Sequence, residues 1–339
     1  MKFVVIGAGA IGAYVGACLA RGGVDVTLVA RGVHLQAMRE RGVRVQSAGG
    51  DFVSHPTATD DFEAVADAGV VFVGLKAYSL PDLAPQIGRY LRPATRVVWA
   101  QNGLPWWYFQ SEGGPFEGTR LESTDPAGVI SDAFAPAHNI GCVAYCSTEI
   151  VEPGVIRHVE GTRFIIGEPD GSGGERCQEI SKMFASGGLK APIETRIRNQ
   201  IWLKLVGNVS FNPVSALTLA TLGELGSDPE VVELLRKMFD ECALVAARLG
   251  VVFPVSLERR LSGGLGIGDH KTSMLQDLEA GKELELDCMS GAVIELAEKI
   301  GVEVPHIRAV HACAKLLGRT SAAKVGRELA ATERSRAAV

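Results

Sequence analysis

The chain has 339 residues, of which 47% are hydrophobic and 22% charged, and its formal net charge is −5 at pH 7. This length and balance are typical of an ordinary soluble protein with two domains. The sequence has no block of Lys and Arg and no apolar run of membrane-spanning length, so we expect neither a nucleic-acid partner nor a membrane association.

The first residues lead directly into a strand pattern, which leaves no room for a signal peptide, and we expect a cytoplasmic location. Seven scattered cysteines, an odd number, favour reduced thiols. Two short patterns, Cys142-x-x-x-Cys146 and His311-x-Cys313, have no second pair at the spacing of a zinc site. We interpret both as core packing and expect no metal site.

A glycine motif follows the apolar run at residues 2–6, and a helical pattern follows the motif. Its six residues are Gly7, Ala8, Gly9, Ala10, Ile11 and Gly12. In such a motif the glycines permit a tight turn, close approach of the backbone to a pyrophosphate, and packing of helix on strand. A second predicted strand at residues 26–29 has the spacing of a βαβ unit, so a nucleotide-binding fold is favoured over a fortuitous glycine loop.

The residue after the second strand bears on the choice of nucleotide. An NAD-specific fold usually has Asp or Glu there to bind the ribose 2′-hydroxyl, whereas this chain has Ala30 and Arg31. The guanidinium of Arg31 can form paired hydrogen bonds with a 2′-phosphate, and the alternative is a solvated arginine at a strand end. We therefore predict NADP (NADPH) as the cofactor.

Further strands are predicted at residues 70–74 and 96–100, with a helix over 81–90 between them, which continues a doubly wound α/β sheet. Lys76 follows the first of these strands, and Gln101-Asn102-Gly103 follows the second. Ligands of open α/β sheets bind beyond the carboxyl ends of the strands, so both segments are expected on the cofactor side. The alternatives are a surface lysine and a plain Asn-Gly turn.

The segment 106–137 is irregular and carries the aromatic cluster Trp106-Trp107-Tyr108-Phe109. Such a long connection is often a lid or a binding loop, although the aromatic residues can instead bury it against the domain. Strands are predicted again at about 140–147, 155–159 and 163–167. The Gly-rich stretch at residues 168–174 then has the composition of a domain linker.

From about residue 175 the periodicity is helical, which predicts an all-helical second domain. The patterns cover residues 231–249, 272–280, 284–300 and 305–317. We therefore expect a Rossmann-type domain over residues 1–170, a helical substrate domain over 176–325, and a tail over 326–339 that frays. The apolar surface of the helical domain could pair into a homodimer.

Lys204, Asn208 and Asn212 follow one another at four-residue steps in an apolar stretch. A helix places such residues on one stripe, where an ammonium and two amides can face one small ligand. The alternative is a polar face turned to water or to carbonyls of a neighbouring helix. Inside a buried helix, such a stripe is costly unless partners satisfy it.

Several of these motifs, taken together, resemble the ketopantoate reductase (2-dehydropantoate 2-reductase) family over about the first 320 residues. They are the Gly7–Gly12 motif, Lys76, Gln101-Asn102-Gly103, the run Lys204-Leu205-Val206-Gly207-Asn208-Val209-Ser210-Phe211-Asn212-Pro213, the segment Ser273-Met274-Leu275-Gln276-Asp277, and Glu285-Leu286-Asp287. The glycine motif is shared by many enzymes, whereas the lysine and asparagine run combined with the last two segments is specific to this family.

The resemblance implies the NADPH-dependent reduction of ketopantoate to (R)-pantoate, a step of pantothenate and coenzyme A biosynthesis, and it implies a role for each matching residue. Lys204 is the general acid that protonates the ketone oxygen, and Glu285 is a cleft residue near it. Asn208, Asn212 and Ser273 hold the 2-oxo acid. Asn102 lies between nicotinamide and substrate, and Lys76 contacts the cofactor. Asp277 and Asp287 keep a structural interpretation as caps or interhelical partners.

The chain departs from the family pattern at Leu222, where the ketopantoate reductases that it resembles have an asparagine that contacts the substrate, and in the long loop at 106–137. Leucine in place of that asparagine favours a more apolar acyl group. Three alternatives therefore stay open: a reductase of a different, branched or aromatic 2-oxo acid, an imine-reducing amino-acid dehydrogenase of related fold, and a non-catalytic NADPH-binding regulator.

Overall fold

The computed structural model describes the backbone of residues 1–337 and the side chains of residues 1–321. The chain divides into two compact units. Unit 1 comprises Met1–Gln101 and Pro105–Gln200, and unit 2 comprises Asn102–Leu104 and Ile201–Val339. The short segment Asn102–Leu104 thus belongs with the helical unit although it directly follows a strand of the sheet.

Unit 1 is built on one mixed sheet, in which nine strands are described in the order β4-β3-β9-β8-β7-β6-β1-β2-β5. The strands are β1 (Phe3–Ile6), β2 (Val26–Val29), β3 (Val43–Ser47), β4 (Phe52–Ser54), β5 (Thr57–Thr59), β6 (Val70–Val73), β7 (Arg96–Trp99), β8 (Asn139–Glu152) and β9 (Val155–Gly167). The predicted strands at 26–29, 70–74 and 96–100 are confirmed. The sequence patterns missed β3, β4 and β5, which are short and only partly buried.

The parallel register of the central strands brings their carboxyl ends to one edge of the sheet. Ile6 pairs with Val29 on one side and with Val73 on the other, and Val73 in turn pairs with Trp99. The segments that follow these four residues therefore leave the sheet at the same edge. This is the edge at which open α/β sheets bind their ligands.

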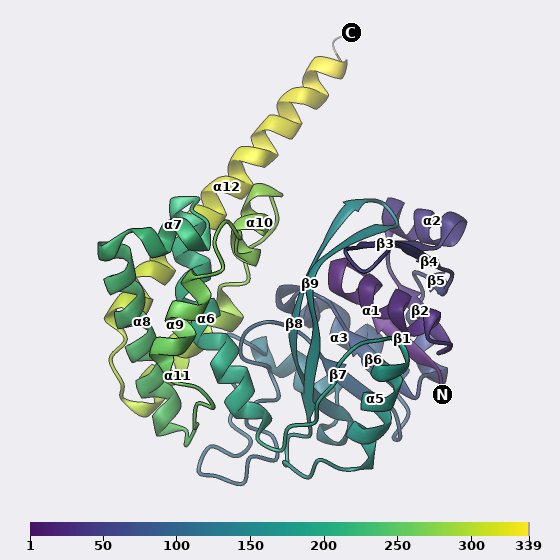
Figure 1. Cartoon of the computed structure of the whole chain (residues 1–339), viewed down its shortest axis with the longest axis horizontal. Helices are drawn as coiled ribbons and strands as arrows, with labels where there is room; N and C mark the ends of the chain where they lie inside the picture. Colours follow the sequence, from purple (N-terminus) through teal and green to yellow (C-terminus); the bar gives the residue numbers. More distant parts are fainter. Residues whose placement is uncertain (338–339) are drawn as a thin grey trace. The chain divides into compact units, whose positions relative to one another are not determined.

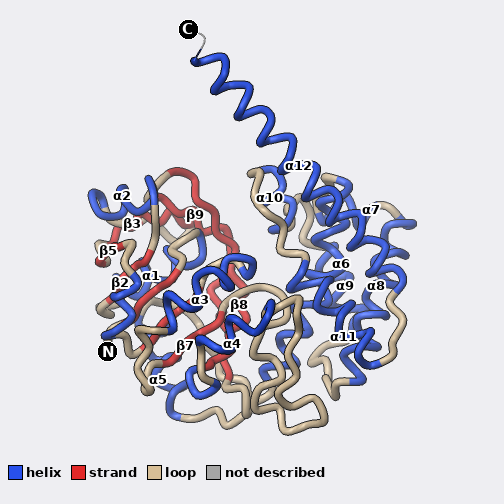
Figure 2. The backbone as a smooth tube through the Cα atoms, turned by 180° about the vertical axis from the view of Figure 1, so that it is seen from behind, coloured by secondary structure: helices blue, strands red, loops and turns tan. Residues whose placement is uncertain are grey.

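Helices cover both faces of this sheet. Those of unit 1 are α1 (Ala10–Arg21), α2 (Gly32–Arg41), α3 (Leu80–Gly88), α4 (Val129–Ala133) and α5 (Glu175–Ser186). In Figure 1, α1 and α5 lie in front of the strands, whereas α3 and α4 lie in front in Figure 2, which shows the opposite side. The doubly wound α/β prediction is therefore confirmed.

The predicted linker at residues 168–174 is not a domain boundary, because it lies inside unit 1. Glu168 is 4% exposed and pairs with Arg176 at the start of α5. The next helix, α5, buries Cys177, Ile180 and Phe184 in the same core as β1 and α1. The predicted division at residues 170–176 is thus wrong, and the second unit begins at Ile201, inside a helix.

The loop at 106–137 is packed into unit 1. Its cluster Trp106–Phe109 is buried, with Trp107 only 1% exposed. The guanidinium of Arg198 donates hydrogen bonds to the carbonyls of Tyr108 and Gln110, at 2.9 and 2.8 Å, and to that of Pro169 at 2.5 Å. Of the two interpretations of this loop, the structure supports burial against the domain rather than a lid.

The regular elements of unit 2 are all helices within its described residues (Figure 1). Its helices are α6 (Ile197–Thr218), whose first turn belongs to unit 1, α7 (Leu222–Ser227), α8 (Pro229–Arg248), α9 (Leu257–Leu265), α10 (Ser273–Glu279), α11 (Ala292–Ile300) and α12 (Pro305–Ala337). A five-residue π turn, Asp287–Gly291, precedes α11. No helix within the described part of the chain has the length and apolarity needed to span a membrane.

The last helix differs from its predicted bounds. We expected a helix over 305–317 and fraying from residue 326, but the described backbone is helical from Pro305 to Ala337. The final two residues of the predicted tail, 338–339, lie outside the described residues.

Candidate active site

The glycine loop of unit 1 has the backbone shape of a phosphate cradle. Gly7 has φ +85°, a conformation that favours glycine. A Cβ on Gly12 would lie 2.3 Å from the carbonyl oxygen of Gly7, so α1 can pack this closely only without a side chain there. A Cβ on Gly9, the N-cap residue of α1, would meet no atom within 4 Å. The loop thus presents open backbone at a helix N-terminus, which fits the pyrophosphate of a dinucleotide.

Arg31 and Lys76 leave the sheet at the same edge as this loop. Arg31 is the N-cap of α2, two residues after β2, and its side chain is exposed. Within the described residues its guanidinium forms no ion pair, so it is available to a ligand. Lys76 is half-buried and precedes a short 3₁₀ turn, Ala77–Ser79. Both residues are placed at the edge where the sequence prediction expected them.

Lys204, Asn208 and Asn212 lie on a single helix, α6, at steps of four residues. Lys204 and Asn208 are half-buried, and Asn212 is 5% exposed. The residues beside them are packed, with Trp202 and Val206 fully buried. The stripe thus lies on a packed helix, with Lys204 and Asn208 partly open to solvent and Asn212 buried.

The two amides of this stripe lack ordinary hydrogen-bonding partners. Within the described side chains, that of Asn208 has none, and the amide nitrogen of Asn212 has only the thioether of Met289, 3.8 Å away. Sulfur is a weak acceptor, and buried amides in folded proteins are normally satisfied. The stripe thus retains hydrogen-bonding capacity that a small polar ligand can use.

Glu285 is 6% exposed and lies just before the π turn that opens α11. The same turn contacts the segment that contains Asn102, because the Leu104 N–H donates to the carbonyl of Cys288 at 2.7 Å. Unit 2 thus brings together Asn102, Asn212 and Glu285 around one turn. Sequence reasoning missed Cys288 and Met289, since a π turn leaves no signal in the helical periodicity.

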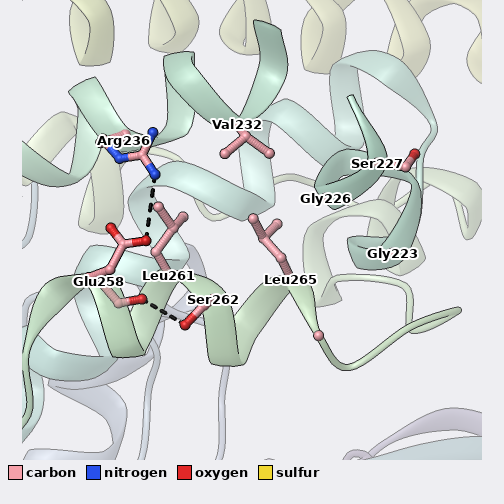
Figure 3. Close-up of a pocket in the computed structure, with 10 residues that line it drawn as sticks. Gly223, Gly226, Ser227, Val232, Arg236, Glu258, Leu261, Ser262 and Leu265 are labelled. Atoms are coloured by element: carbon pink, nitrogen blue, oxygen red, sulfur yellow. Dashed lines mark hydrogen bonds and ion pairs between the residues drawn. The ribbon is translucent and has the colours of Figure 1, made fainter. Parts of the chain in front are cut away.

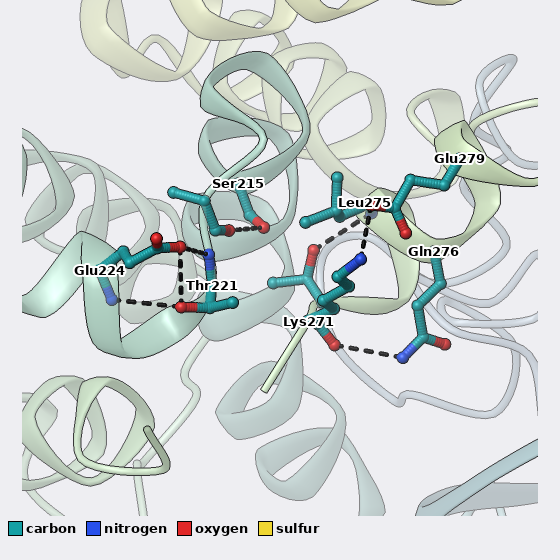
Figure 4. A network of polar contacts seen from close by, with 9 residues as sticks. Ser215, Thr221, Glu224, Lys271, Leu275, Gln276 and Glu279 are labelled. Atoms are coloured by element: carbon teal, nitrogen blue, oxygen red, sulfur yellow. Dashed lines mark hydrogen bonds and ion pairs between the residues drawn. The ribbon is translucent and has the colours of Figure 1, made fainter. Parts of the chain in front are cut away.

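Ser273 and Leu222 lie at the starts of two neighbouring helices. Ser273 is the first residue of α10, is exposed, and follows the N-cap Thr272. Leu222 begins α7, and its N–H donates to the carbonyl of His270 at 3.0 Å. Figure 4 shows the polar contacts that fix these two starts, including the capping box of Thr221 with Glu224 and the pair of Lys271 with Glu279.

A pocket of about 470 Å³ lies between α7, α8 and α9. Its lining includes Leu261, Leu265 and the ion pair of Arg236 with Glu258, with an N–O distance of 3.5 Å (Figure 3). None of the predicted site residues lines this pocket. One of its lining residues, Gly223, directly follows Leu222.

The described residues include no group of three or more His, Cys, Asp or Glu side chains that could hold a metal. Cys142 is buried, as expected. Cys313 is exposed, so the interpretation of Cys313 as part of the core is wrong. Asp287 pairs with Lys315 of α12 at 3.0 Å, which confirms its interpretation as an interhelical partner.

The α/β unit with its glycine loop, followed by a helical unit, defines the class of two-domain nicotinamide-dependent oxidoreductases. Two family models match the chain: Ketopantoate reductase PanE/ApbA over residues 3–106, and the C-terminal model of the same family over residues 196–318. The chain belongs to the ketopantoate reductase family. This confirms the resemblance drawn from the sequence motifs.

Curated relatives match over nearly the whole chain. A 2-dehydropantoate 2-reductase of Mesorhizobium japonicum is 44% identical over 318 residues, which cover 94% of this chain and 98% of the relative. A 2-dehydropantoate 2-reductase of Halobacterium salinarum is 31% identical, with 94% and 99% covered.

Solved structures agree with the fold. A candidate ketopantoate reductase from Ralstonia solanacearum superposes with a TM-score of 0.89 at 38% identity, covering 94% of this chain and 98% of the other. A D-mandelate dehydrogenase in complex with NADH and anilino(oxo)acetate has a TM-score of 0.81 at 18% identity, with 95% and 99% covered. At that identity the second likeness concerns the fold alone.

Proposed function

We propose that the protein reduces a 2-oxo acid to the 2-hydroxy acid with NADPH, with 2-dehydropantoate (ketopantoate) to (R)-pantoate as the specific reaction. The observation that carries this proposal is the stripe on α6, where an ammonium and two poorly partnered amides face one way from an otherwise packed helix. The name shared by the curated relatives supports the choice of substrate.

The cofactor supplies a hydride to the carbonyl carbon, and the residues of this chain bind, orient and protonate. The glycine loop and the N-terminus of α1 hold the pyrophosphate, while Arg31 binds the 2′-phosphate and Lys76 contacts the cofactor. In the helical unit, the amides of Asn208 and Asn212 and the hydroxyl of Ser273 hold the acid. Asn102 lies between nicotinamide and substrate.

Lys204 acts as the general acid in this proposal. As the carbonyl carbon accepts the hydride, negative charge develops on the ketone oxygen, and the Lys204 ammonium donates a proton to it. Its positive charge also attracts the carboxylate of the substrate. Glu285 orients this ammonium or keeps it protonated.

Replacement of Lys204 tests this assignment. We expect Lys204→Ala to lower kcat by roughly 10²–10⁴-fold, the usual contribution of a placed proton donor, while the dissociation constant for NADPH stays within about twofold. Lys237→Ala is the matched control, because Lys237 is an exposed lysine on α8. Steady-state kinetics and a fluorescence titration with NADPH measure both quantities, and a variant of Lys204 with normal turnover would rule out the general-acid role.

The identity of the acid is tested with a panel of 2-oxo acids. Leu222 is only 6% exposed, so its side chain is packed and offers no polar contact. We expect the highest kcat/KM with ketopantoate. A higher value with a branched or aromatic 2-oxo acid would reassign the substrate, and an absolute requirement for an amine would identify an imine reductase instead.

A further inference from the structure

The π turn Asp287–Gly291 is an unusual element in a helical unit. Its defining hydrogen bond runs from the Gly291 N–H to the carbonyl of Leu286, at 2.9 Å, and α11 continues directly from it. π turns are rare and occur frequently at functional sites, where the surrounding structure maintains them. The contacts on either side of this turn therefore show what it supports and what keeps it in place.

One side of the turn holds the segment Asn102–Leu104. The carbonyl of Cys288 accepts a hydrogen bond from the Leu104 N–H at 2.7 Å. The sulfur of Cys288 lies 3.6 Å from the carbonyl oxygen of Asn102. Gly103, between them, has φ +88°, and a Cβ there would lie 2.4 Å from the Cys288 carbonyl oxygen. The backbone of residues 102–104 thus contacts Cys288 so closely that only glycine fits at position 103.

The turn also reaches two other residues of the proposed site. Met289 contacts the amide of Asn212 through its sulfur, and Glu285 lies two residues before the turn begins. The Cys288 thiol further lies 3.8 Å from the Glu285 carbonyl oxygen. A shift of this turn therefore moves the supports of Asn102, Asn212 and Glu285 together.

The opposite side of the turn is fastened to α12. The Ser290 hydroxyl, in a residue that is 1% exposed, lies 2.8 Å from Nδ1 of His311. Burial lowers the pKa of His311, which favours the neutral ring, and Nδ1 can then accept the hydroxyl proton. One turn of α12 further on, Lys315 pairs with Asp287 at the start of the π turn, but both of these side chains are exposed.

We propose that Ser290 and His311 are positioning residues for the active site: their hydrogen bond holds the π turn, and the turn holds Asn102 and Glu285 in place. This inference rests on the proposed function, since it assigns these two residues a role in the same site. Neither is a catalytic residue, because both act through the turn.

Hydrogen exchange measures this link without any assay of activity. His311→Phe removes the acceptor, whereas His311→Asn presents an amide oxygen at the position of Nδ1. We expect peptides that span residues 102–104 to exchange roughly tenfold faster in His311→Phe and Ser290→Ala, and to return close to the original rate in His311→Asn. Ser181→Ala, which deletes a hydroxyl that donates to the Ala191 carbonyl in unit 1, is the control and leaves this segment unchanged.

Kinetics supply the second readout. We expect kcat with the 2-oxo acid to fall roughly tenfold in His311→Phe, with KM for NADPH unchanged, because small displacements of a positioned group cost rate. His311→Asn restores kcat. A purely structural role would lower thermal stability in His311→Phe without this fall in kcat.

The two readouts separate the inference from the function on which it rests. Unchanged exchange at residues 102–104 in both His311→Phe and Ser290→Ala would overturn the positioning role, whatever the rates. If the unmodified protein reduces no 2-oxo acid, the proposed function is wrong and the positioning role in that reaction falls with it. The exchange result would still establish or refute the physical link from α12 to Asn102.

Discussion

Two amides, those of Asn208 and Asn212, are short of hydrogen-bonding partners on a helix whose other residues are well packed. A ligand that hydrogen-bonds to these amides adds polar contacts that the protein itself does not supply, each with a net worth of about 0.5–1.5 kcal/mol. Polar recognition of this kind discriminates strongly, because an analogue that cannot form the bonds leaves the amides unpaired. In the proposed function, these two amides recognise the oxygen atoms of the 2-oxo acid.

Arg31 carries the residue-scale prediction on cofactor choice. It is exposed at the N-terminus of α2, where its guanidinium can meet a 2′-phosphate that NADPH has and NADH lacks. We expect Arg31→Ala to lower kcat/KM for NADPH by roughly tenfold to a hundredfold and to leave that for NADH within about twofold.

Arg39→Ala is the matched control for this experiment. Arg39 lies on the same helix, but its guanidinium is engaged with Asp60 at 2.9 Å and with the carbonyl of Ala58 at 3.0 Å. Its removal should leave the ratio of the two kcat/KM values unchanged. Equal losses of kcat/KM with NADPH and NADH in Arg31→Ala would show that Arg31 does not bind the 2′-phosphate.

At the scale of elements, α6 is one continuous helix that runs from unit 1 into unit 2. Its first turn belongs to unit 1, and the rest, with the whole lysine and asparagine stripe, belongs to unit 2. Arg198 in that first turn donates to carbonyls of the 106–137 loop and of Pro169. The loop therefore serves as an anchor for the start of the helix that carries Lys204.

Arg198 thus gives a prediction for stability. Arg198→Met keeps the length of the side chain and removes the donors of its three hydrogen bonds to backbone carbonyls. We expect the free energy of unfolding to fall by roughly 2–4 kcal/mol, measured by urea denaturation. Arg196→Met, two residues earlier and exposed, should change it by less than about 0.5 kcal/mol. Equal effects of the two substitutions would contradict the anchoring role.

At the scale of the whole molecule, each unit contains a partly buried histidine that is held neutral. Burial is the main cause that lowers the pKa of His34 in unit 1 and of His311 in unit 2. His34 accepts the Gly154 N–H at Nδ1, at 3.1 Å, which agrees with the neutral form. Each ring therefore binds a proton less readily in the folded than in the unfolded protein.

This difference predicts how stability depends on pH. The unfolded histidines bind protons near pH 6.5, whereas the folded ones do so at lower pH, so stability is full above about pH 6.5 and falls as the pH is lowered. We expect the double variant His34→Asn/His311→Asn, which keeps an acceptor at both positions, to lose less stability between pH 7.5 and 5.5. Urea midpoints at the two pH values test this, and identical losses in both proteins would contradict it.

The sequence by itself determined the features that depend on local pattern. The glycine motif predicts a strand, a tight turn and a helix because its spacing is dictated by backbone geometry, and the stripe on α6 follows from the 3.6-residue repeat. These local signals also identified the family. The predicted linker was wrong because its composition resembles that of a boundary, whereas burial of Glu168 and packing of α5 depend on distant residues.

Tertiary structure alone decided which of these features work together. The 106–137 loop is packed against unit 1 because Arg198, some ninety residues later in the chain, donates hydrogen bonds to two of its carbonyls. The π turn gathers Asn102, Asn212 and Glu285 through contacts that span up to 186 residues of sequence. Such contacts leave no trace in local periodicity, because hydrogen bonding and burial are properties of the folded chain.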